Sequence, residues 1–278
     1  MEVDHQDQVA AATFDVGGIG VPGPAASYVV TQDALEAYAD ATDDVPGGTV
    51  FAIVPVWETI APASLTVASV EARARVVHYE HDILTHRPIE AGMTLTSRAT
   101  PTSIRSRPHG TMLVIKTETR DEDGALVNEQ YVTEFFRGVE TQSTVGEPAP
   151  GHRLDVDGAA PIAEITYPLA ADQPARYAAA SGDHFAIHLD DEFARAVGLP
   201  GRIVHGLCTL AFAGRAVREA AGVDDPGPLR RLAVRFSAPL FPEDSLTTRV
   251  WDVDGGYGFE ATNGAGVPVL KDGRAELR

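Results

Sequence analysis

A weak internal repeat is the feature that most constrains the fold of this chain. Three pairs of segments align in the same order along the sequence: 38–44 with 177–183, 53–55 with 204–206, and 87–95 with 238–246. The last two pairs share one shift, which is about 12 residues larger than the shift of the first pair. This pattern predicts a duplicated domain, whose second copy carries extra residues between Asp183 and His205.

Both copies predict the same order of secondary structure. A short helix comes first, then a longer apolar helix, and then β-branched or alternating stretches separated by turn residues. The expected helices are 31–41 and 56–70 in the first copy, and 174–180 and 207–221 in the second. The expected strands are 94–100, 111–119 and 125–137, and then 231–236, 245–253, 256–262 and 267–278. A helix followed by antiparallel strands is typical of an α+β fold, in which the sheet wraps around the helix that it buries.

The two copies are separated by a stretch with the composition of a linker. Residues 141–160 (TQSTVGEPAPGHRLDVDGAA) are rich in Gly, Pro, Ser and Asp and show no periodicity. We therefore predict an N-terminal unit at residues 1–140, a linker at 141–160 and a C-terminal unit at 161–278. A chain of 278 residues is long enough for two domains of ordinary size.

Composition excludes several classes of function. A formal net charge of −18 argues against nucleic-acid binding, which needs clustered Lys and Arg to neutralise phosphates. The single cysteine, Cys208, cannot form an internal disulfide, which fits a reducing compartment. The N-terminus has neither the basic nor the apolar region of a signal peptide, and prolines and Glu58 interrupt the most apolar stretch, 50–70. These features predict a soluble cytoplasmic protein with no membrane partner.

The densest chemical signal lies between Tyr177 and Gly206. It consists of Ser181-Gly182-Asp183, Ile187-His188-Leu189-Asp190, Phe193-Ala194, Gly198, Pro200 and Ile203-Val204-His205-Gly206. This long, gapped pattern resembles the signature of the MaoC-like dehydratases and (R)-specific enoyl-CoA hydratases. The chain departs from that signature at Phe185-Ala186, where the family usually has Asn-Pro.

The resemblance implies a fold and an activity. The fold would be a double hotdog, two repeats that each wrap an antiparallel sheet around a long central helix, with one catalytic half. The activity would be that of an (R)-specific 2-enoyl-CoA hydratase, or of a 3-hydroxyacyl thioester dehydratase in the reverse direction. The substrate would be a thioester of coenzyme A or of acyl carrier protein, and no metal, flavin or nicotinamide would be needed. A homodimer of double hotdogs is possible.

Within this pattern, the residue types suit the hydration of a 2-enoyl thioester. Asp183 and His188 can hold one water, remove its proton and return a proton on the same face of the substrate. The backbone N–H of Gly206, at a helix N-terminus, can stabilise the negative charge that develops on the thioester oxygen. Ser181 and His205 are expected to line the substrate site, and His205 is expected to shape the turn before Gly206.

An anionic carrier requires positive charge on an otherwise acidic protein. Arg230, Arg231 and Arg235 form the tightest basic cluster in the sequence and are candidates to bind the carrier. Ordinary surface arginines would explain the same cluster equally well.

The first copy lacks the catalytic residues. Asp44 aligns with Asp183, but no histidine follows it, and Pro55, which aligns with Gly206, has no N–H to donate. We expect this half to be inactive and to hold the acyl tail, with Ala63 of its helix facing that tail.

Other interpretations remain open from the sequence. A thioesterase could use the same fold, and a non-catalytic thioester-binding subunit could keep the motif. His184 and His188 have the spacing of metal ligands, but no third ligand follows at a suitable distance. Asp190, Asp191 and Glu192 fit a solvated helix N-terminus, and Cys208 fits core packing.

Overall fold

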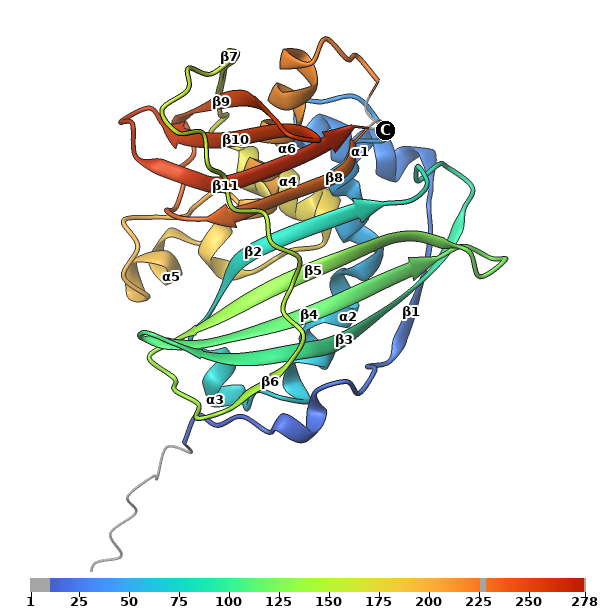
Figure 1. The fold of residues 1–278 in the computed structure, drawn as a ribbon, viewed down its shortest axis with the longest axis vertical. Helices are drawn as coiled ribbons and strands as arrows, with labels where there is room; N and C mark the ends of the chain where they lie inside the picture. The colour runs from blue at the N-terminus through green and yellow to red at the C-terminus, as the bar shows by residue number, and fades with distance from the viewer. Residues whose placement is uncertain (1–10, 226–228, 278) are drawn as a thin grey trace, which may run out of the picture.

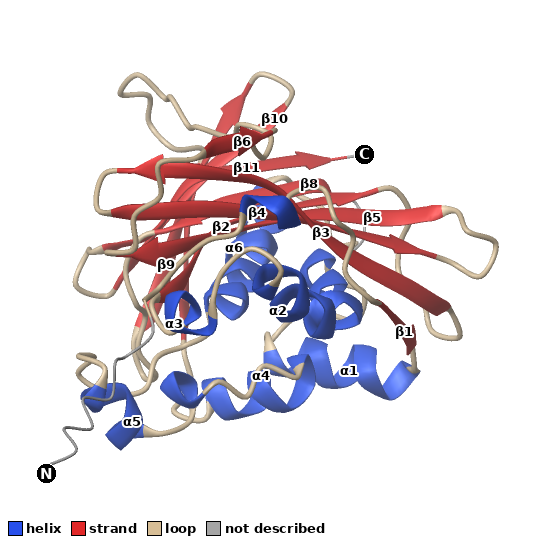
Figure 2. Cartoon of the chain, turned by 90° about the horizontal axis from the view of Figure 1, so that it is seen from below, coloured by secondary structure: helices blue, strands red, loops and turns tan. Residues whose placement is uncertain are grey.

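One curved antiparallel sheet and the helices on its concave face make up the protein (Figures 1 and 2). The computed structural model describes residues 11–225 and 229–277. The strands are β1 (Ala25–Val29), β2 (Val76–Thr85), β3 (Thr94–Arg107), β4 (Gly110–Arg120), β5 (Leu126–Arg137), β6 (Thr144–Gly146), β7 (Ala163–Pro168), β8 (Leu229–Phe236), β9 (Ser245–Val253), β10 (Gly256–Asn263) and β11 (Pro268–Leu277). Across the described residues, no helix combines the length and the apolar character needed to cross a membrane.

The strand order confirms the duplication. The sheet runs β1-β3-β4-β5-β2-β8-β11-β10-β9-β7, with β6 paired to β3. In each half the first strand neighbours the third, followed by the fourth, the fifth and the second, so the two halves have the same topology and meet at β2 and β8. The predicted α+β double hotdog is confirmed.

The helices form two layers beneath the sheet (Figure 2). The helical segments are the short η1 (Val16–Gly18), α1 (Gln32–Ala41), the 3-10 helix η2 (Thr49–Val56), α2 (Trp57–Leu65), α3 (Val70–Arg73), α4 (Gln173–Ser181), η3 (Ala186–His188), α5 (Asp191–Ala196) and α6 (Gly206–Ala220). The α2 and α6 helices lie against the sheet, and α1 and α4 lie side by side further out. The aligned tyrosines of the repeat meet there, because the hydroxyls of Tyr38 and Tyr177 are 3.0 Å apart.

The two central helices differ, which corrects one prediction. In the second half the expected helix is present as α6, and its apolar residues are buried. In the first half the expected helix 56–70 is present but shorter: α2 spans Trp57–Leu65 and follows the 3-10 helix η2, so the predicted C-terminal end is wrong. Pro55 lies within η2 and Pro62 within α2, so neither proline marks the residue at which α2 ends.

Four strands were not predicted, and one of them lies in the predicted linker. The sequence patterns do not indicate β1, β2, β6 or β7. In β2, the polar side chains His78, Glu80, His81 and Asp82 interrupt the apolar alternation by which strands are recognised. The 141–160 segment contains β6 and then crosses the outer face of the sheet (Figure 1). The division at residues 140 and 161 stays a prediction.

A buried ion pair joins the two halves. Asp44, at the end of the first repeat's α1 segment, accepts hydrogen bonds from Arg218 of α6 at 2.5 Å. Both side chains are nearly buried, at 11% and 6% exposed. The position that aligns with Asp183 therefore serves to hold α6 against the first half.

Removing one partner of this pair should destabilise the protein strongly. In Asp44→Ala, Arg218 would keep its charge in a buried position, and such a loss costs about 3–5 kcal/mol of unfolding free energy. Replacing both partners, as in Asp44→Ala/Arg218→Met, should recover much of the loss. Urea denaturation of the single and double variants tests this, with the more exposed Asp43→Ala as control. A loss below 1 kcal/mol for Asp44→Ala would contradict it.

Candidate active site

The end of α4 sets the position of Asp183. Gly182 ends the helix in the left-handed region, at φ +82°, which residues with a side chain rarely adopt. In the turn that follows, the Ser181 hydroxyl accepts the N–H of Asp183 at 3.2 Å, and an Asp183 carboxylate oxygen accepts the N–H of Phe185 at 3.1 Å. The carboxylate is therefore fixed by local hydrogen bonds in a part-buried position.

His188 follows on the short η3 segment and is buried. Its Nδ1–H donates to the carbonyl of Ile203 at 2.9 Å, because a carbonyl can only accept. In the neutral ring this leaves the lone pair of Nε2 available to take a proton. The Ile203 carbonyl therefore fixes the tautomer that a general base requires.

His205 brings the third polar group to the site. It precedes α6, is 1% exposed, and donates from Nε2 to the backbone carbonyl of Asp183 at 3.0 Å. Its ring stacks on His188 with 3.7 Å between centroids and 23° between planes. Side-chain N or O atoms of Asp183, His188 and His205 lie within 4.8 Å of one another. The structure thus brings the predicted pair together and adds His205 to it.

Burial shifts the pKa values of Asp183, His188 and His205 so that the uncharged form of each side chain is favoured. It raises the pKa of Asp183, although His188 and the N–H of Phe185 oppose the shift. It lowers the pKa of His188, and it lowers the pKa of His205 to about 3. Near neutral pH the two imidazoles are uncharged, so His188 is available as a base.

Gly206 begins α6 next to this group. No side chain in the described part of the chain caps the helix, so its first N–H groups face outward with the positive end of the helix dipole. A Cβ at Gly206 would lie 3.0 Å from Cε1 of Phe236, which is closer than nearly all real contacts. The absence of a side chain at Gly206 thus lets the Phe236 ring pack closely against the start of α6.

Two aromatic neighbours of the site were not predicted. Trp57, at the start of α2, approaches Gly182 from the first half, with its Cδ1 3.7 Å from where a Cβ would lie. Phe236 approaches Gly206 from the end of β8. Neither belongs to the motif, and both come from distant segments, so only the three-dimensional fold identifies them.

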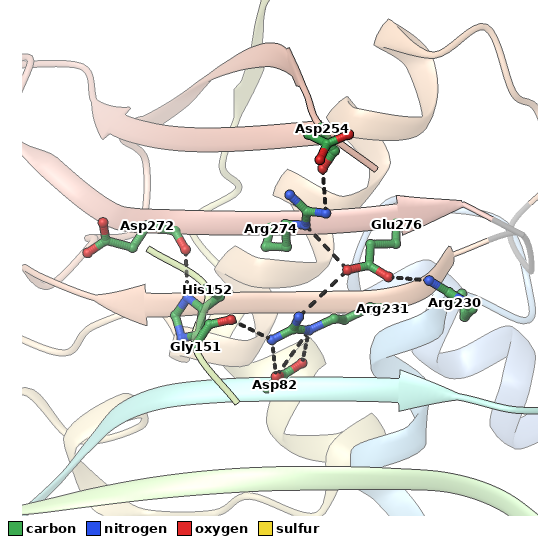
Figure 3. A network of polar contacts seen from close by, with 9 residues as sticks. All are labelled: Asp82, Gly151, His152, Arg230, Arg231, Asp254, Asp272, Arg274 and Glu276. Carbon is green, nitrogen blue, oxygen red and sulfur yellow. Dashed lines mark hydrogen bonds and ion pairs between the residues drawn. The ribbon is translucent and has the colours of Figure 1, made fainter. Parts of the chain in front are cut away.

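The structure does not bring the three arginines to this site. Leu232 contacts α6 at Gly214, so the neighbouring Arg231 points to the opposite, outer face of the sheet. There Arg230 pairs with Glu276 at 2.5 Å, Arg231 with Asp82 at 2.7 Å and Arg235 with Asp272 at 2.9 Å. Figure 3 shows Arg230 and Arg231 in this network, where Arg231 also binds the carbonyl of Gly151 in the linker. Their role in substrate binding stays a prediction.

The remaining candidate residues have structural or surface positions outside the group formed by Asp183, His188 and His205. Cys208 is buried in α6, and burial raises its pKa to about 12, so it is no nucleophile at neutral pH. His184 is exposed, whereas His188 is buried, and the close group of ligating side chains does not include His184. The Asp190 carboxylate caps α5 by accepting two backbone N–H groups, as expected for a helix N-terminus.

Comparison with known proteins finds related dehydratases and hydratases. The family described as "MaoC like domain" matches residues 155–271. The chain is 32% identical to 3-hydroxyacyl-thioester dehydratase Y of Mycobacterium tuberculosis over 73% of each protein. It is 26% identical to the peroxisomal enoyl-CoA hydratase 2 of Arabidopsis thaliana over 63% of this chain, and it spans 60% of that relative.

A solved structure shows the same fold. A MaoC-like dehydratase from Phytophthora capsici superposes with a TM-score of 0.81 at 23% identity, over 92% of this chain and 96% of that one. At this level of identity the likeness concerns the fold alone.

The buried neutral histidines should make the protein sensitive to acid. His81, His188 and His205 have pKa values lowered by burial, to about 4 for His81 and about 3 for His205. Below about pH 6.5 the unfolded chain binds protons that the native state refuses, so stability falls by up to about 1.4 kcal/mol per pH unit for each histidine. The raised pKa of Asp183 offsets part of this fall. Urea midpoints at pH 7.5, 6.5 and 5.5 measure it, and a constant midpoint would contradict it.

Proposed function

The chain belongs to the MaoC-like dehydratase family and is a hydro-lyase of the hydratase and dehydratase type, and we propose that it interconverts 2-enoyl and (R)-3-hydroxyacyl thioesters at Asp183 and His188. The observation that carries the proposal is the geometry of this pair. A carboxylate and an imidazole with a free Nε2 lie together beside the uncapped start of α6. These are the groups that hydration of a double bond conjugated to a thioester requires.

The reaction follows from these positions. A water held between Asp183 and His188 loses a proton to the pair as its oxygen bonds to C3 of the substrate. Electron density moves to the thioester oxygen, which the N–H of Gly206 and the α6 dipole stabilise. The pair then returns a proton to C2 on the same face, and the reverse sequence eliminates water. This scheme requires no metal, flavin or nicotinamide.

Phe185-Ala186, where the chain departs from the family signature, lies between Asp183 and His188. Phe185 is 56% exposed and contacts the ring of Phe193, so an apolar pair stands where the family usually has an amide side chain. We propose that it affects which thioesters enter. Both carriers, coenzyme A and acyl carrier protein, fit the proposal, as does a homodimer. Turnover measured on matched substrates with each carrier separates the two carriers.

Each member of the pair should be essential for turnover. Asp183→Asn and His188→Gln should each lower kcat by at least ~100-fold, the usual contribution of a positioned acid or base. The double variant should be little worse, because the two groups act as a unit. The exposed neighbour His184→Gln is the matched control and should keep its activity. Near-normal turnover in either single variant would exclude this assignment.

The same assay distinguishes the alternative functions. With crotonyl-CoA, hydration removes the absorbance of the conjugated double bond and releases no thiol. A thioesterase would release free coenzyme A, and a non-catalytic binding subunit would do neither while still binding the thioester. Loss of absorbance without thiol release is the expected result.

We also propose that the first half, as the non-catalytic copy, accommodates the acyl tail. The sequence predicts that Ala63 faces this tail, but Ala63 is completely buried against the segment at Gly23, so a bulky residue there would disrupt the core. A better test position lines a small cavity among the described residues. Two such cavities have volumes of about 20 and 10 Å³, enough for single waters, and the larger is lined by Phe51, Ala52, Thr85 and Asn128, among others. A long tail would therefore require side chains of this half to move.

Enlarging that cavity should favour longer substrates. Phe51→Leu should raise the ratio of kcat/KM for a ten-carbon enoyl thioester over crotonyl thioester, because it removes ring volume from the cavity wall. Phe136→Leu, an equally buried exchange away from the cavity, is the control for general loosening. An unchanged ratio in Phe51→Leu, or equal changes in both variants, would show that the tail does not enter here.

A further inference from the structure

His205 makes two contacts that together link both members of the catalytic pair. Its Nε2–H binds the backbone carbonyl of Asp183 at 3.0 Å, and its ring covers one face of His188 at a centroid distance of 3.7 Å. Asp183 and His188 lie in the segment after α4, whereas His205 directly precedes α6. His205 is therefore the side chain through which the start of α6 holds both catalytic residues.

We propose that His205 is a positioning residue for the reaction: its ring supports the His188 imidazole, and its Nε2–H fixes the backbone at Asp183. This inference rests on the proposed function of the pair. It goes beyond the expectation that His205 shapes the turn before Gly206, because it assigns the residue an effect on the protonation of His188.

The physical reason lies in solvation. His188 is buried and its pKa is lowered by that burial, and the stacked ring excludes water from one of its faces. If His188 takes up a proton, the His205 ring stacked on it must be uncharged, because two positive charges in contact would repel each other. The low pKa of His205 satisfies this condition. A shift of position by even 1 Å in a catalytic group can cost ~100-fold in rate.

Few other ionisable groups face the two rings. Asp183 and His184 come from the turn after α4. The ring centroid of Tyr177, on α4, lies 4.8 Å from that of His205. Burial raises the pKa of Tyr177, so its phenol stays neutral. On α5, which packs against η3, the acid Asp191 accepts the N–H of Arg202. Asp183 is a charged neighbour of His188 whose position also depends on His205, so His205→Phe, which releases Asp183 but keeps the ring, separates the two effects on the titration of His188.

Three substitutions separate the two contacts. His205→Phe keeps a ring on His188 but removes the donor, His205→Gln keeps a donor of similar reach but removes the ring, and His205→Ala removes both. We expect kcat to fall ~10-fold to ~100-fold in His205→Ala, with KM changed less, and Gln and Phe each to recover part of it. Cys208→Ala, on the next turn of α6, is the control and should keep kcat.

The pH profile gives a readout that a merely structural role would not move. Without the ring, water reaches His188 and its pKa should rise toward the ordinary value of ~6.5. The acid limb of kcat/KM should therefore move to higher pH in His205→Ala and His205→Gln, and stay in place in His205→Phe. Rates are normalised to folded enzyme by circular dichroism.

The outcomes are distinguishable. Normal kcat in all three variants, or equal losses with an unmoved acid limb, would overturn the positioning role while His188→Gln remains inactive. If His188→Gln itself retained activity, the proposed function would fail instead.

Discussion

The pairing of β2 with β8 is the interaction on which the rest of the structure depends. These two strands join the halves into one sheet, with Asp82 opposite Ala233 in the antiparallel register. The pairing is strengthened on the outer face, where the Asp82 carboxylate accepts hydrogen bonds from two nitrogens of Arg231. This two-point contact fixes the relative orientation of the two side chains as well as pairing their charges. Because β2 and β8 are the second strands of the two copies, their union also places α1 beside α4 and Trp57 beside the turn at Gly182.

Duplication of the fold permitted the two copies to diverge at matching positions. Asp183 faces His188, whereas the aligned Asp44 is neutralised by Arg218 and stabilises the joint between the halves. Gly206 begins α6 and keeps its backbone N–H, whereas the aligned Pro55 lies within the 3-10 helix η2 and has no N–H to offer. Each change is small in sequence, but together they leave one half without the proposed base and the proposed oxyanion donor while preserving its packing.

The sequence was sufficient to predict what depends on local pattern. Helical spacing located α6, alternation located β9, and the gapped motif identified the pair that the structure brings together. Prediction from the sequence failed for features that depend on tertiary contacts. The polar strand β2 is stable because it is paired on both sides, and the arginines of β8 are satisfied by carboxylates of neighbouring strands, Asp82, Asp272 and Glu276. The stacking of His205 on His188 joins residues 17 positions apart that are separated by α5 and a loop, whose path no sequence pattern specifies.

Burial of the proposed catalytic pair, Asp183 and His188, has a consequence for the direction of the proposed reaction. Loss of water raises the pKa of the Asp183 carboxyl and lowers that of His188, so the two values move toward each other. When a donor and an acceptor approach equal affinity for the proton, transfer in either direction needs little free energy. An enzyme that adds water needs a base at the start and an acid at the end, and the reverse reaction needs the opposite order. A pair with converging pKa values can fill both roles, which suits a site that serves hydration and dehydration with the same two side chains.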